Sequence, residues 1–242
     1  MTIVPNYYKN FKCSAGACKH TCCAGWEIDI DPESLARYQK DGIPNINLQG
    51  TPHFEMDKNL RCRFLRPDGL CLMIIDRGES YLCQICKDHP RFRNFWSGIT
   101  EVGLGLSCEE AAKLILFAKA PMKLEVLEAE SCEDLQPALC SLPEDEKYLW
   151  NLRSELFSQA EALADPLQAR LLEYLIYRYI PDALYDGLLD ERMAFVRNCV
   201  NEVTDLWDAS EDQSNAALLE IARKWSEETE YNTDLIAEKI KG

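Results

Sequence analysis

Cysteines crowd the first half of this 242-residue chain, and their type and spacing point most directly to chemistry. Nine of the 12 cysteines fall between Cys13 and Cys108. The opening group, in the text CSAGACKHTCC, places Cys13, Cys18, Cys22 and Cys23 within 11 residues. Thiolates are soft donors that select zinc, copper(I) or iron-sulfur clusters. This density therefore predicts a metal or iron-sulfur site.

The other cysteines of this half are more scattered, and they are Cys62, Cys71, Cys83, Cys86 and Cys108. Structural zinc sites usually contain two C-x2-C pairs that close a tetrahedron. The opening group instead has spacings of four, three and zero residues. This irregular spacing favours an iron-sulfur cluster completed by tertiary contacts, with zinc as the alternative. The thiols suffice for two centres, or for one centre with spare ligands, and the sequence leaves both open.

The sequence leaves open whether four further residues bind metal. Cys83 and Cys86 form the one C-x2-C pair of the chain, so either both ligate or one is incidental. His20 and His89 are candidate nitrogen ligands, although a lone histidine is more often a polar loop residue.

The sequence indicates a reducing setting. Its start, MTIVPNYYKNFKC, has no apolar run between a basic start and a small-residue cleavage site, so it does not look like a secretory signal. We therefore expect a cytoplasmic location, where clustered cysteines bind metal more often than they form disulfides. No stretch approaches the roughly 20 consecutive apolar residues of a membrane span. We expect no transmembrane segment, and peripheral association with a membrane stays open.

The formal net charge of -15 is unevenly distributed. Residues 1–122 hold 15 Lys and Arg against 14 Asp and Glu, whereas residues 123–242 hold 11 against 27. The second half is therefore acidic. Such a surface argues against nucleic-acid binding and favours a basic partner, such as a protein substrate that presents lysine.

Short elements must position the scattered cysteines. Asp31-Pro32 predicts the start of a short helix ending near residue 40, because an aspartate caps free amides and a proline at this position loses no hydrogen bond. Asp41-Gly42 ends that helix, and residues 42–59 are predicted to form a loop.

Two further elements carry cysteines. A turn at Pro67-Asp68-Gly69 is predicted to join two short strands, with Cys62 and Cys71 on its arms so that their thiols converge. Ser107-Cys108-Glu109-Glu110 matches a capping box, which places Cys108 in the first turn of a helix. The amides and dipole at such a position stabilise a thiolate.

The chain is predicted to be mainly α, in three segments. Residues 1–120 form a cysteine-rich metal- or iron-sulfur-binding region of loops and short helices, with a small β-hairpin around the metal centre. Residues 121–143 form a linker, and residues 144–242 form an acidic helical domain that packs on the first region as a bundle. In that domain apolar residues recur every three or four positions, and Pro166 and Pro181 separate helices. The run LLEYLIYRYI is predicted to be core.

Five segments, in order, resemble the flagellin lysine N-methylase family and the broader group of cysteine-rich bacterial proteins with a zinc- or iron-chelating CxxCxxCC-type domain. The first half contributes FKCSAGACKHTCCAGWEIDID, CRFLRPDGLCLMIIDRGESYLCQICKDHPRFRN and LGLSCEEAAKLIL. The acidic half contributes RLLEYLIYRYIPDALYDG and IARKWSEETEYN. The resemblance covers most of the chain.

This resemblance implies a cytoplasmic enzyme that transfers a methyl group from S-adenosylmethionine to lysine side chains of flagellin and needs a four-iron, four-sulfur (4Fe-4S) cluster. The recurring cysteines of the family fall on Cys13, Cys18, Cys22, Cys23, Cys62, Cys71, Cys86 and Cys108. Pro90-Arg91 is similar to the Pro-Arg pair of the family. Arg91, with Arg93 as the alternative, is the candidate partner of the carboxylate of the methyl donor.

The chain also departs from the family. It is shorter than the enterobacterial members, Cys83 is extra to the pattern, and His89 stands where an aromatic residue is usual. No G-x-G-x-x-G follows a predicted strand, which argues against a Rossmann methyltransferase. The C-x3-C-x2-C spacing of radical S-adenosylmethionine enzymes is also absent, so the methyl donor rests on the resemblance alone.

Lysine must lose a proton before its nitrogen attacks in a polar transfer. Asp186, Glu79 and Tyr81 are candidate bases, and none is assigned. A second interpretation stays open, in which the chain is a non-catalytic zinc- or iron-binding module whose acidic helical half recruits a basic protein partner.

Overall fold

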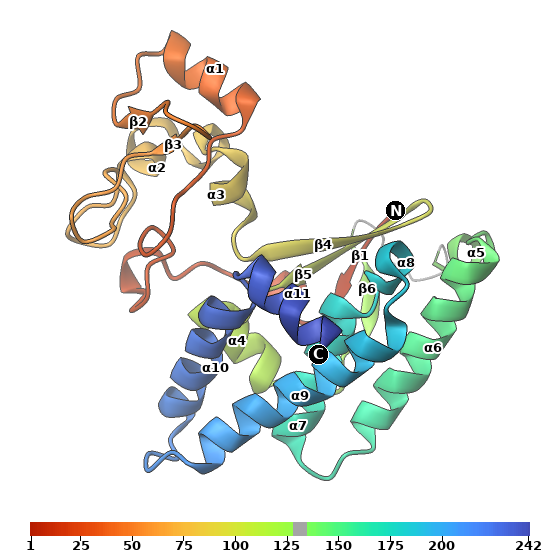
Figure 1. Cartoon of the computed structure of the whole chain (residues 1–242). Coiled ribbons are helices and arrows are strands. Elements are labelled where there is room, and N and C mark those ends of the chain that lie inside the picture. Colours follow the sequence, from red (N-terminus) through yellow and green to blue (C-terminus); the bar gives the residue numbers. More distant parts are fainter. Residues whose placement is uncertain (128–134) are drawn as a thin grey trace. The chain divides into compact units, whose positions relative to one another are not determined.

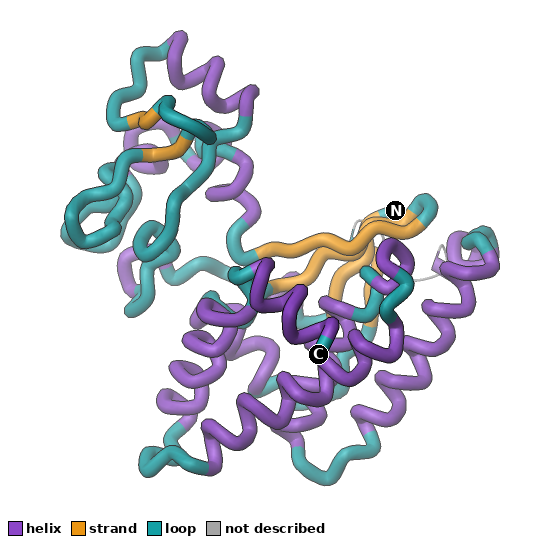
Figure 2. Tube along the Cα trace, viewed as in Figure 1, coloured by secondary structure: helices purple, strands orange, loops and turns teal. Residues whose placement is uncertain are grey.

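The computed structural model describes residues 1–127 and 135–242, and these fall into two compact units (Figures 1 and 2). We call Cys13–His89 the cysteine unit, and Met1–Lys12 together with Pro90–Gly242 the helical unit. The predicted mainly α class is confirmed, because helices hold far more residues than strands. The division at 120 and 143 follows composition, and as a set of domain boundaries it stays a prediction. Part of the predicted linker, including Cys132, lies outside the described residues.

The cysteine unit is mostly loop (Figure 2), with short elements between. These are η2 (Ala15–Ala17), α1 (Pro32–Lys40), β2 (Ile46–Asn47), β3 (His53–Phe54), α2 (Leu72–Arg77), η3 (Glu79–Tyr81) and α3 (Gln84–Asp88). Its small apolar core is organised by aromatic rings. The Phe54 ring centroid lies 5.8 Å from that of Tyr38 and 5.2 Å from that of Phe64. The core therefore rests on a few large side chains rather than on regular layers.

Asp31 fixes two helices of the cysteine unit at once. One carboxylate oxygen accepts the N–H of Ser34 at 2.9 Å, which caps α1 as predicted. The other accepts the N–H of Gln84 at 2.8 Å, at the start of α3. Burial opposes ionisation, but the hydrogen bonds from Gln84 and Ser34 outweigh it and lower the pKa of Asp31. One side chain thus joins two segments far apart in the sequence.

Two local predictions in this unit need correction. The turn at residues 67–69 exists, because the N–H of Arg66 donates to the carbonyl of Leu70 at 2.9 Å. Its second arm, however, is helix α2 rather than a strand, and a single bridge pairs Leu65 with Cys71. The predicted loop at residues 42–59 contains the hairpin β2–β3. Runs as short and apolar as LCLMII do not distinguish helix from strand by periodicity.

The helical unit contains a four-stranded sheet in the order β4-β5-β1-β6. Its strands are β1 (Thr2–Pro5), β4 (Arg91–Trp96), β5 (Ile99–Leu104) and β6 (Leu124–Val126). β4 and β5 form an antiparallel hairpin, and β1 pairs parallel with β5 and antiparallel with β6. This sheet was not predicted. β1 is short and its partners are distant in sequence, although the Ser97-Gly98 turn between apolar runs is a usable hairpin signal.

The remaining elements of the helical unit are helical. They are η1 (Tyr8–Asn10), α4 (Glu109–Leu116), α5 (Leu135–Cys140), α6 (Glu144–Glu161), α7 (Pro166–Tyr179), α8 (Ala183–Asp186), α9 (Leu189–Asp208), α10 (Asn215–Thr229) and α11 (Thr233–Lys241). The long helices α6, α7 and α9 lie on one side of the sheet (Figure 1). The LLEYLIYRYI run forms most of α7 and is core as predicted. Within the described ranges no helix combines the length and apolarity that crossing a bilayer requires.

A buried ion pair joins the sheet to the helices. Glu101 on β5 and Arg153 on α6 have side chains 0% and 1% exposed, and an Arg153 guanidinium N–H donates to Glu101 at 2.7 Å. Asn94 on β4 donates to Glu101 at 3.1 Å and to the carbonyl of Tyr177 on α7 at 2.7 Å. Because every charge is paired, this polar group can stay buried without the cost of an unpaired ion.

The double cap predicts the effect of Asp31→Ala. Each lost cap costs about 1 kcal/mol, so the variant should destabilise the cysteine unit by about 2 kcal/mol. Amide hydrogen exchange of α1 and α3 measures the loss. Asp31→Asn should lose less, because its amide oxygen still accepts.

The stabilisation that Asp31 gives the wild type depends on pH. Because folding lowers the pKa of Asp31, this stabilisation is present above the unfolded pKa of 3.8 and is lost as the pH falls through the lower folded pKa. Glu33→Ala is the matched control, since Glu33 is an exposed neighbour in the same turn. Equal exchange in Asp31→Ala and Glu33→Ala would contradict this account.

Candidate metal centre

Five cysteines gather in the core of the cysteine unit. They are Cys62 and Cys83, which are buried, and Cys23, Cys71 and Cys86, which are half-buried. All five belong to the same apolar cluster as Tyr38 and Phe54. Four of them are in the predicted ligand set, and the fifth, Cys83, is the residue that the family pattern leaves out. The structure thus brings part of the predicted set together and adds one thiol.

Backbone pairing brings Cys23, Cys62 and Cys71 to this place. The N–H of Cys62 donates to the carbonyl of Cys23 at 2.8 Å, so the end of the opening group lies beside residue 62. The turn after Leu65 then returns the chain, and the bridge between Leu65 and Cys71 places residue 71 next to the same segment. Convergence of Cys62 and Cys71, expected from the turn, follows from this bridge and not from paired strands.

Cys83 and Cys86 enter from α3. Cys83 immediately precedes the helix, and its carbonyl accepts the N–H of Lys87 at 3.1 Å. The two thiols affect each other's ionisation. Cys86 lowers the pKa of Cys83, whereas Cys83 and burial raise the pKa of Cys86 well above its ordinary value.

The five thiols of this core shift one another's pKa values. A hydrogen bond from Cys22 lowers the pKa of Cys23 to about 7, although burial opposes the shift. Burial raises the pKa of Cys62 to about 11, and negative charge on Cys23, Cys71 and Cys83 adds to the rise. Burial also raises the pKa of Cys71. A thiolate on one residue therefore suppresses ionisation of the next.

The rest of the opening group lies outside this core. Cys13 and Cys22 are exposed and Cys18 is half-buried. The sulfur of Cys18 donates to the carbonyl of His20 at 2.9 Å. The opening group therefore does not wrap around one point in this structure, and its assignment as a ligand set stays a prediction.

Gly16 explains how the opening loop packs. A Cβ added at Gly16 would lie 2.8 Å from the carbonyl oxygen of Asp68 and 3.2 Å from a methyl carbon of Leu70. The loop from Cys13 to Cys18 therefore lies directly against the turn that leads to Cys71. Only glycine permits this approach without a shift of backbone.

A metal ion needs at least three donors around one point, and among residues 1–127 and 135–242 no three Cys, His, Asp or Glu side chains are arranged in that way. Among these thiols, Cys22 hydrogen-bonds to Cys23, and Cys83 and Cys86 shift each other's pKa. The chemistry of the buried set nevertheless fits a soft metal, because its donors are all sulfur. Binding would release the thiol protons.

Cys108 belongs to the helical unit. It is the N-cap residue of α4 and is half-buried. The predicted capping box is wrong in one respect, because the hydroxyl of Ser107 donates to the hydroxyl of Tyr231 at 3.0 Å and does not cap the helix. Cys108 therefore lies at the start of the helix, as expected. The residue before it, Ser107, is hydrogen-bonded to Tyr231.

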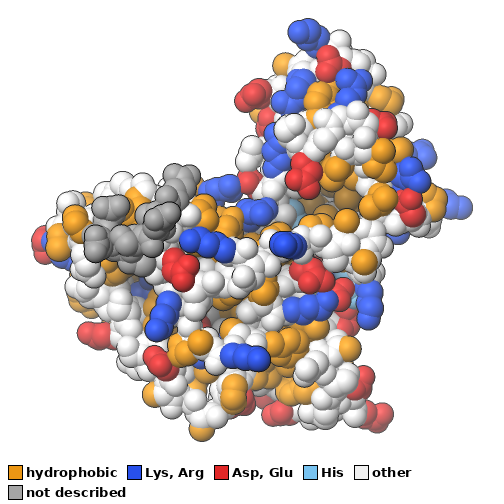
Figure 3. Space-filling view, turned by 180° about the vertical axis from the view of Figure 1, so that it is seen from behind, with side chains coloured by type: hydrophobic (Ala, Val, Ile, Leu, Met, Phe, Trp, Pro, Cys, Tyr) orange, Lys and Arg blue, Asp and Glu red, His pale blue; other side chains and the backbone are white. Residues whose placement is uncertain are grey.

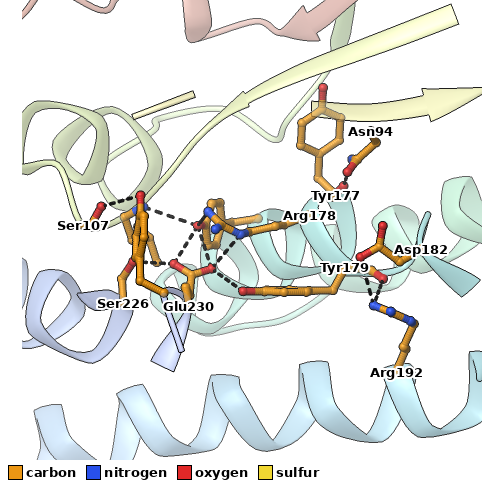
Figure 4. A network of polar contacts seen from close by, with 12 residues as sticks. Asn94, Ser107, Tyr177, Arg178, Tyr179, Asp182, Arg192, Ser226 and Glu230 are labelled. Carbon is orange, nitrogen blue, oxygen red and sulfur yellow. Dashed lines mark hydrogen bonds and ion pairs between the residues drawn. The ribbon is translucent and has the colours of Figure 1, made fainter. Parts of the chain in front are cut away.

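A buried carboxylate organises the surroundings of that loop (Figure 4). Glu230 is 0% exposed and accepts the hydroxyl of Tyr174 at 2.9 Å and that of Tyr179 at 3.0 Å. The guanidinium of Arg178 pairs with it at 3.1 Å, and the hydroxyl of Ser226 also donates to it. Four donors satisfy one carboxylate, so the charge stays buried at little cost.

This network holds the segment before Cys108. The N–H of Leu106 donates to the hydroxyl of Tyr174 at 3.3 Å. A Cβ on Gly105 would lie 3.2 Å from a guanidinium nitrogen of Arg178. The position of Cys108 thus depends on residues far along the chain. The sequence signal for these distant residues is Glu230, which lies in the segment IARKWSEETEYN. The resemblance identified that segment as a motif without giving Glu230 a role.

Arg91, the predicted cofactor-binding residue, begins β4 in the helical unit. Its Nε donates to the hydroxyl of Tyr8 at 2.8 Å, and its guanidinium carbon lies 5.4 Å from the ring centroid of Phe11. Arg93 is exposed on the same strand. Arg91 is therefore held in a defined orientation by η1 and the residue after it, and its role toward a methyl donor stays a prediction.

The candidate bases are poorly suited to take a proton. Asp186 pairs with Arg192 at 2.7 Å, and its pKa is lowered by that hydrogen bond despite some burial. Tyr81 donates its hydroxyl to Asp41 at 2.6 Å, and burial and that bond raise its pKa. Glu79 is exposed in η3. None gains a role from the structure.

Comparison with known proteins identifies relatives. The chain is 22% identical over 201 residues to a lysine-N-methylase of Salmonella typhimurium, a match that covers 77% of this chain and 50% of that protein. A lysine-N-methylase of Salmonella choleraesuis matches to the same extent. The flagellar biosynthetic protein FliU of Salmonella muenchen is 29% identical over 126 residues, which cover 46% of this chain and 75% of that protein.

These matches confirm the relationship to the lysine N-methylase family that the motifs predicted. The chain spans about half the length of the two lysine-N-methylases that it matches. No family model matches the chain. No solved structure matches it either.

The Cys22–Cys23 hydrogen bond makes a prediction for the metal-free protein. Alkylation of Cys23 should be half-maximal near pH 7, because the thiolate is the reactive form and its pKa is about 7. Cys22→Ala removes the main cause of that shift, so the midpoint should rise toward the ordinary 9. Mass spectrometry of the alkylated peptide against pH measures both. Cys13→Ala is the control, and an unchanged midpoint in Cys22→Ala would contradict the assignment.

Proposed function

We propose that this protein is an iron-sulfur-dependent protein lysine N-methyltransferase that uses S-adenosylmethionine and acts on flagellin in the cytoplasm. The relationship to lysine-N-methylases carries the reaction class. The chain spans about half the length of those proteins. Their activity therefore has to be measured on this chain directly.

The cysteine unit supports the metal dependence. Five thiols share one apolar core, and an all-sulfur donor set matches zinc or an iron-sulfur cluster. The irregular spacing of the opening group favours the cluster, with zinc as the alternative. In this proposal the ligands come from the predicted set of eight cysteines. When bound, such a cluster supplies an electron-transfer group or a binding point for the amino and carboxylate groups of the donor.

The sheet supports a donor site that differs from a Rossmann fold. Within residues 1–127 and 135–242 this sheet has three strand pairings, of which β1–β5 is parallel and the other two are antiparallel. A Rossmann site needs parallel strands whose carboxyl ends meet a glycine-rich helix start. In this proposal Arg91 pairs with the carboxylate of S-adenosylmethionine, since Tyr8 and Phe11 already hold its guanidinium in place.

Charge supports a lysine-bearing substrate. The cysteine unit carries 9 Lys and Arg against 11 Asp and Glu, whereas the rest of the chain carries 17 against 30. Both signs are interspersed on the face of the cysteine unit at the upper right of Figure 3. The acidic helical unit is therefore the part that would attract a basic protein. The name of the FliU relative points to the flagellum, which supports flagellin as that substrate.

The same charge favours one alternative. A zinc- or iron-binding module without catalytic activity would also need its cysteine unit and could recruit a basic partner through the acidic helical unit. The two proposals differ in whether labelled methyl groups reach the partner. The transfer assay below therefore separates them.

The assay uses the full chain, purified without oxygen, with labelled S-adenosylmethionine and flagellin from the same organism. Cys62→Ala and Cys71→Ala should each reduce methyl transfer roughly tenfold or more and reduce bound metal, because each removes a proposed ligand. Cys140→Ala, an exposed residue at the end of α5, is the control and should keep both.

Two outcomes contradict this function. Wild-type protein that is colourless, carries stoichiometric zinc and transfers no label would replace the enzyme with the binding module. Full transfer by Cys62→Ala with its metal lost would separate the activity from the cysteines.

A further inference from the structure

Cys83 has no role in the family pattern, yet it is the most enclosed thiol of the cysteine unit. Its side chain is 0% exposed. The hydrogen-bond contact of its sulfur is the backbone carbonyl of Asp29, at 3.7 Å. A contact of that length is weak. Packing in the apolar cluster therefore does most to hold the sulfur in place.

Cys199 provides a reference for an ordinary buried cysteine. It is also 0% exposed, in the middle of α9. Burial raises its pKa to about 12, and the charges that act on it belong to Glu202, Lys239 and Glu230 rather than to thiols. A thiol in such surroundings is an inert part of the core.

Cys83 differs from Cys199 in its neighbours. It shares one apolar cluster with Cys23, Cys62, Cys71 and Cys86. These thiols come from segments of the chain that are well separated in sequence, at residues 23, 62–71 and 83–86. Packing alone does not require that a buried cysteine share its cluster with four other thiols.

Hydrogen bonds from outside the cluster also hold the backbone next to Cys83. Asp31 accepts the N–H of Gln84 at 2.8 Å, directly after Cys83. The carbonyl of Cys83 accepts the N–H of Lys87 at 3.1 Å. These bonds hold the backbone from Cys83 to Lys87, the segment that contains the Cys83–Cys86 pair, and such support is what a site that binds a ligand requires.

We propose that Cys83 is a metal ligand in this chain, and that with Cys86 it forms a two-thiolate knuckle of a centre whose other ligands come from Cys23, Cys62 and Cys71. The C-x2-C spacing lets two thiolates reach one metal. Each thiol releases its proton to solvent as it binds. The centre lies within the cysteine unit. This inference rests on the proposed metal dependence, and methyl transfer is not required for it.

The experiment compares unfolding with and without metal. Wild type, Cys83→Ala and Cys199→Ala are prepared as full chains without oxygen, reconstituted with iron and sulfide or loaded with zinc, and then stripped with chelator. Metal and sulfide per chain are measured together with the unfolding midpoint of each form. A ligand binds only the folded state, so bound metal raises the midpoint.

If Cys83 is a ligand, Cys83→Ala should lose most of the bound metal, roughly a tenfold drop in occupancy, and most of the metal-dependent rise in midpoint. Cys199→Ala should lower both midpoints by equal amounts and keep its metal. If Cys83→Ala behaves like Cys199→Ala, the inference is overturned, even where the variant is less stable. This comparison does not require the variant to be as stable as wild type.

Other results separate this inference from the proposed function. A wild type that binds neither zinc nor iron and sulfide would overturn both the inference and the metal dependence. A wild type that needs Cys83 for metal but transfers no methyl group would leave the inference standing and remove the methyltransferase. Transfer activity that survives loss of metal in Cys83→Ala would remove the metal dependence of the reaction alone.

Discussion

Thiols that share a small apolar core cannot all ionise unless a cation lies among them. Burial and mutual repulsion raise the pKa of Cys62, and burial raises that of Cys71. In the metal-free cysteine unit, thiols such as Cys62 and Cys86 therefore keep their protons. A bound cation would replace those protons and allow several thiolates to coexist. The unit has little regular secondary structure and few large core residues, so ligand bonds would supply stability that packing does not.

The sequence predicted what local chemistry determines. Asp31-Pro32 gave the start of α1, and the turn at residues 67–69 gave the return of the chain toward Cys62. It did not show that Asp31 also caps α3, because that bond joins segments 53 residues apart. The strand expected after Cys71 is a helix, since its short apolar run fits either state.

The same limit applies to the candidate site. Cysteine density identified the region, but only the folded chain separates the enclosed thiols from Cys13 and Cys22 at the surface. The sequence leaves open whether Cys83 ligates, and the folded chain buries it in the same apolar cluster as the other enclosed thiols. The sheet of the helical unit was missed for a related reason, because β1 finds its partner β5 only through tertiary contact.

The helical unit contributes rigidity and charge. Two buried carboxylates, Glu101 and Glu230, are each paired with an arginine. Glu101 joins the sheet to a helix, and the network of Glu230 joins the start of α4 to the end of α10. Its surface carries most of the negative charge of the chain. An acidic helical unit and a cysteine-rich unit in one chain suit a protein that holds a basic substrate and performs its chemistry with the help of a metal.

X-ray absorption at the metal edge of the full chain, purified without oxygen, tests this account most directly. Thiolate ligation by the buried cysteines predicts a first coordination shell of sulfur alone, at about 2.3 Å from the metal. A first shell made mainly of nitrogen or oxygen at about 2.0–2.1 Å would contradict it.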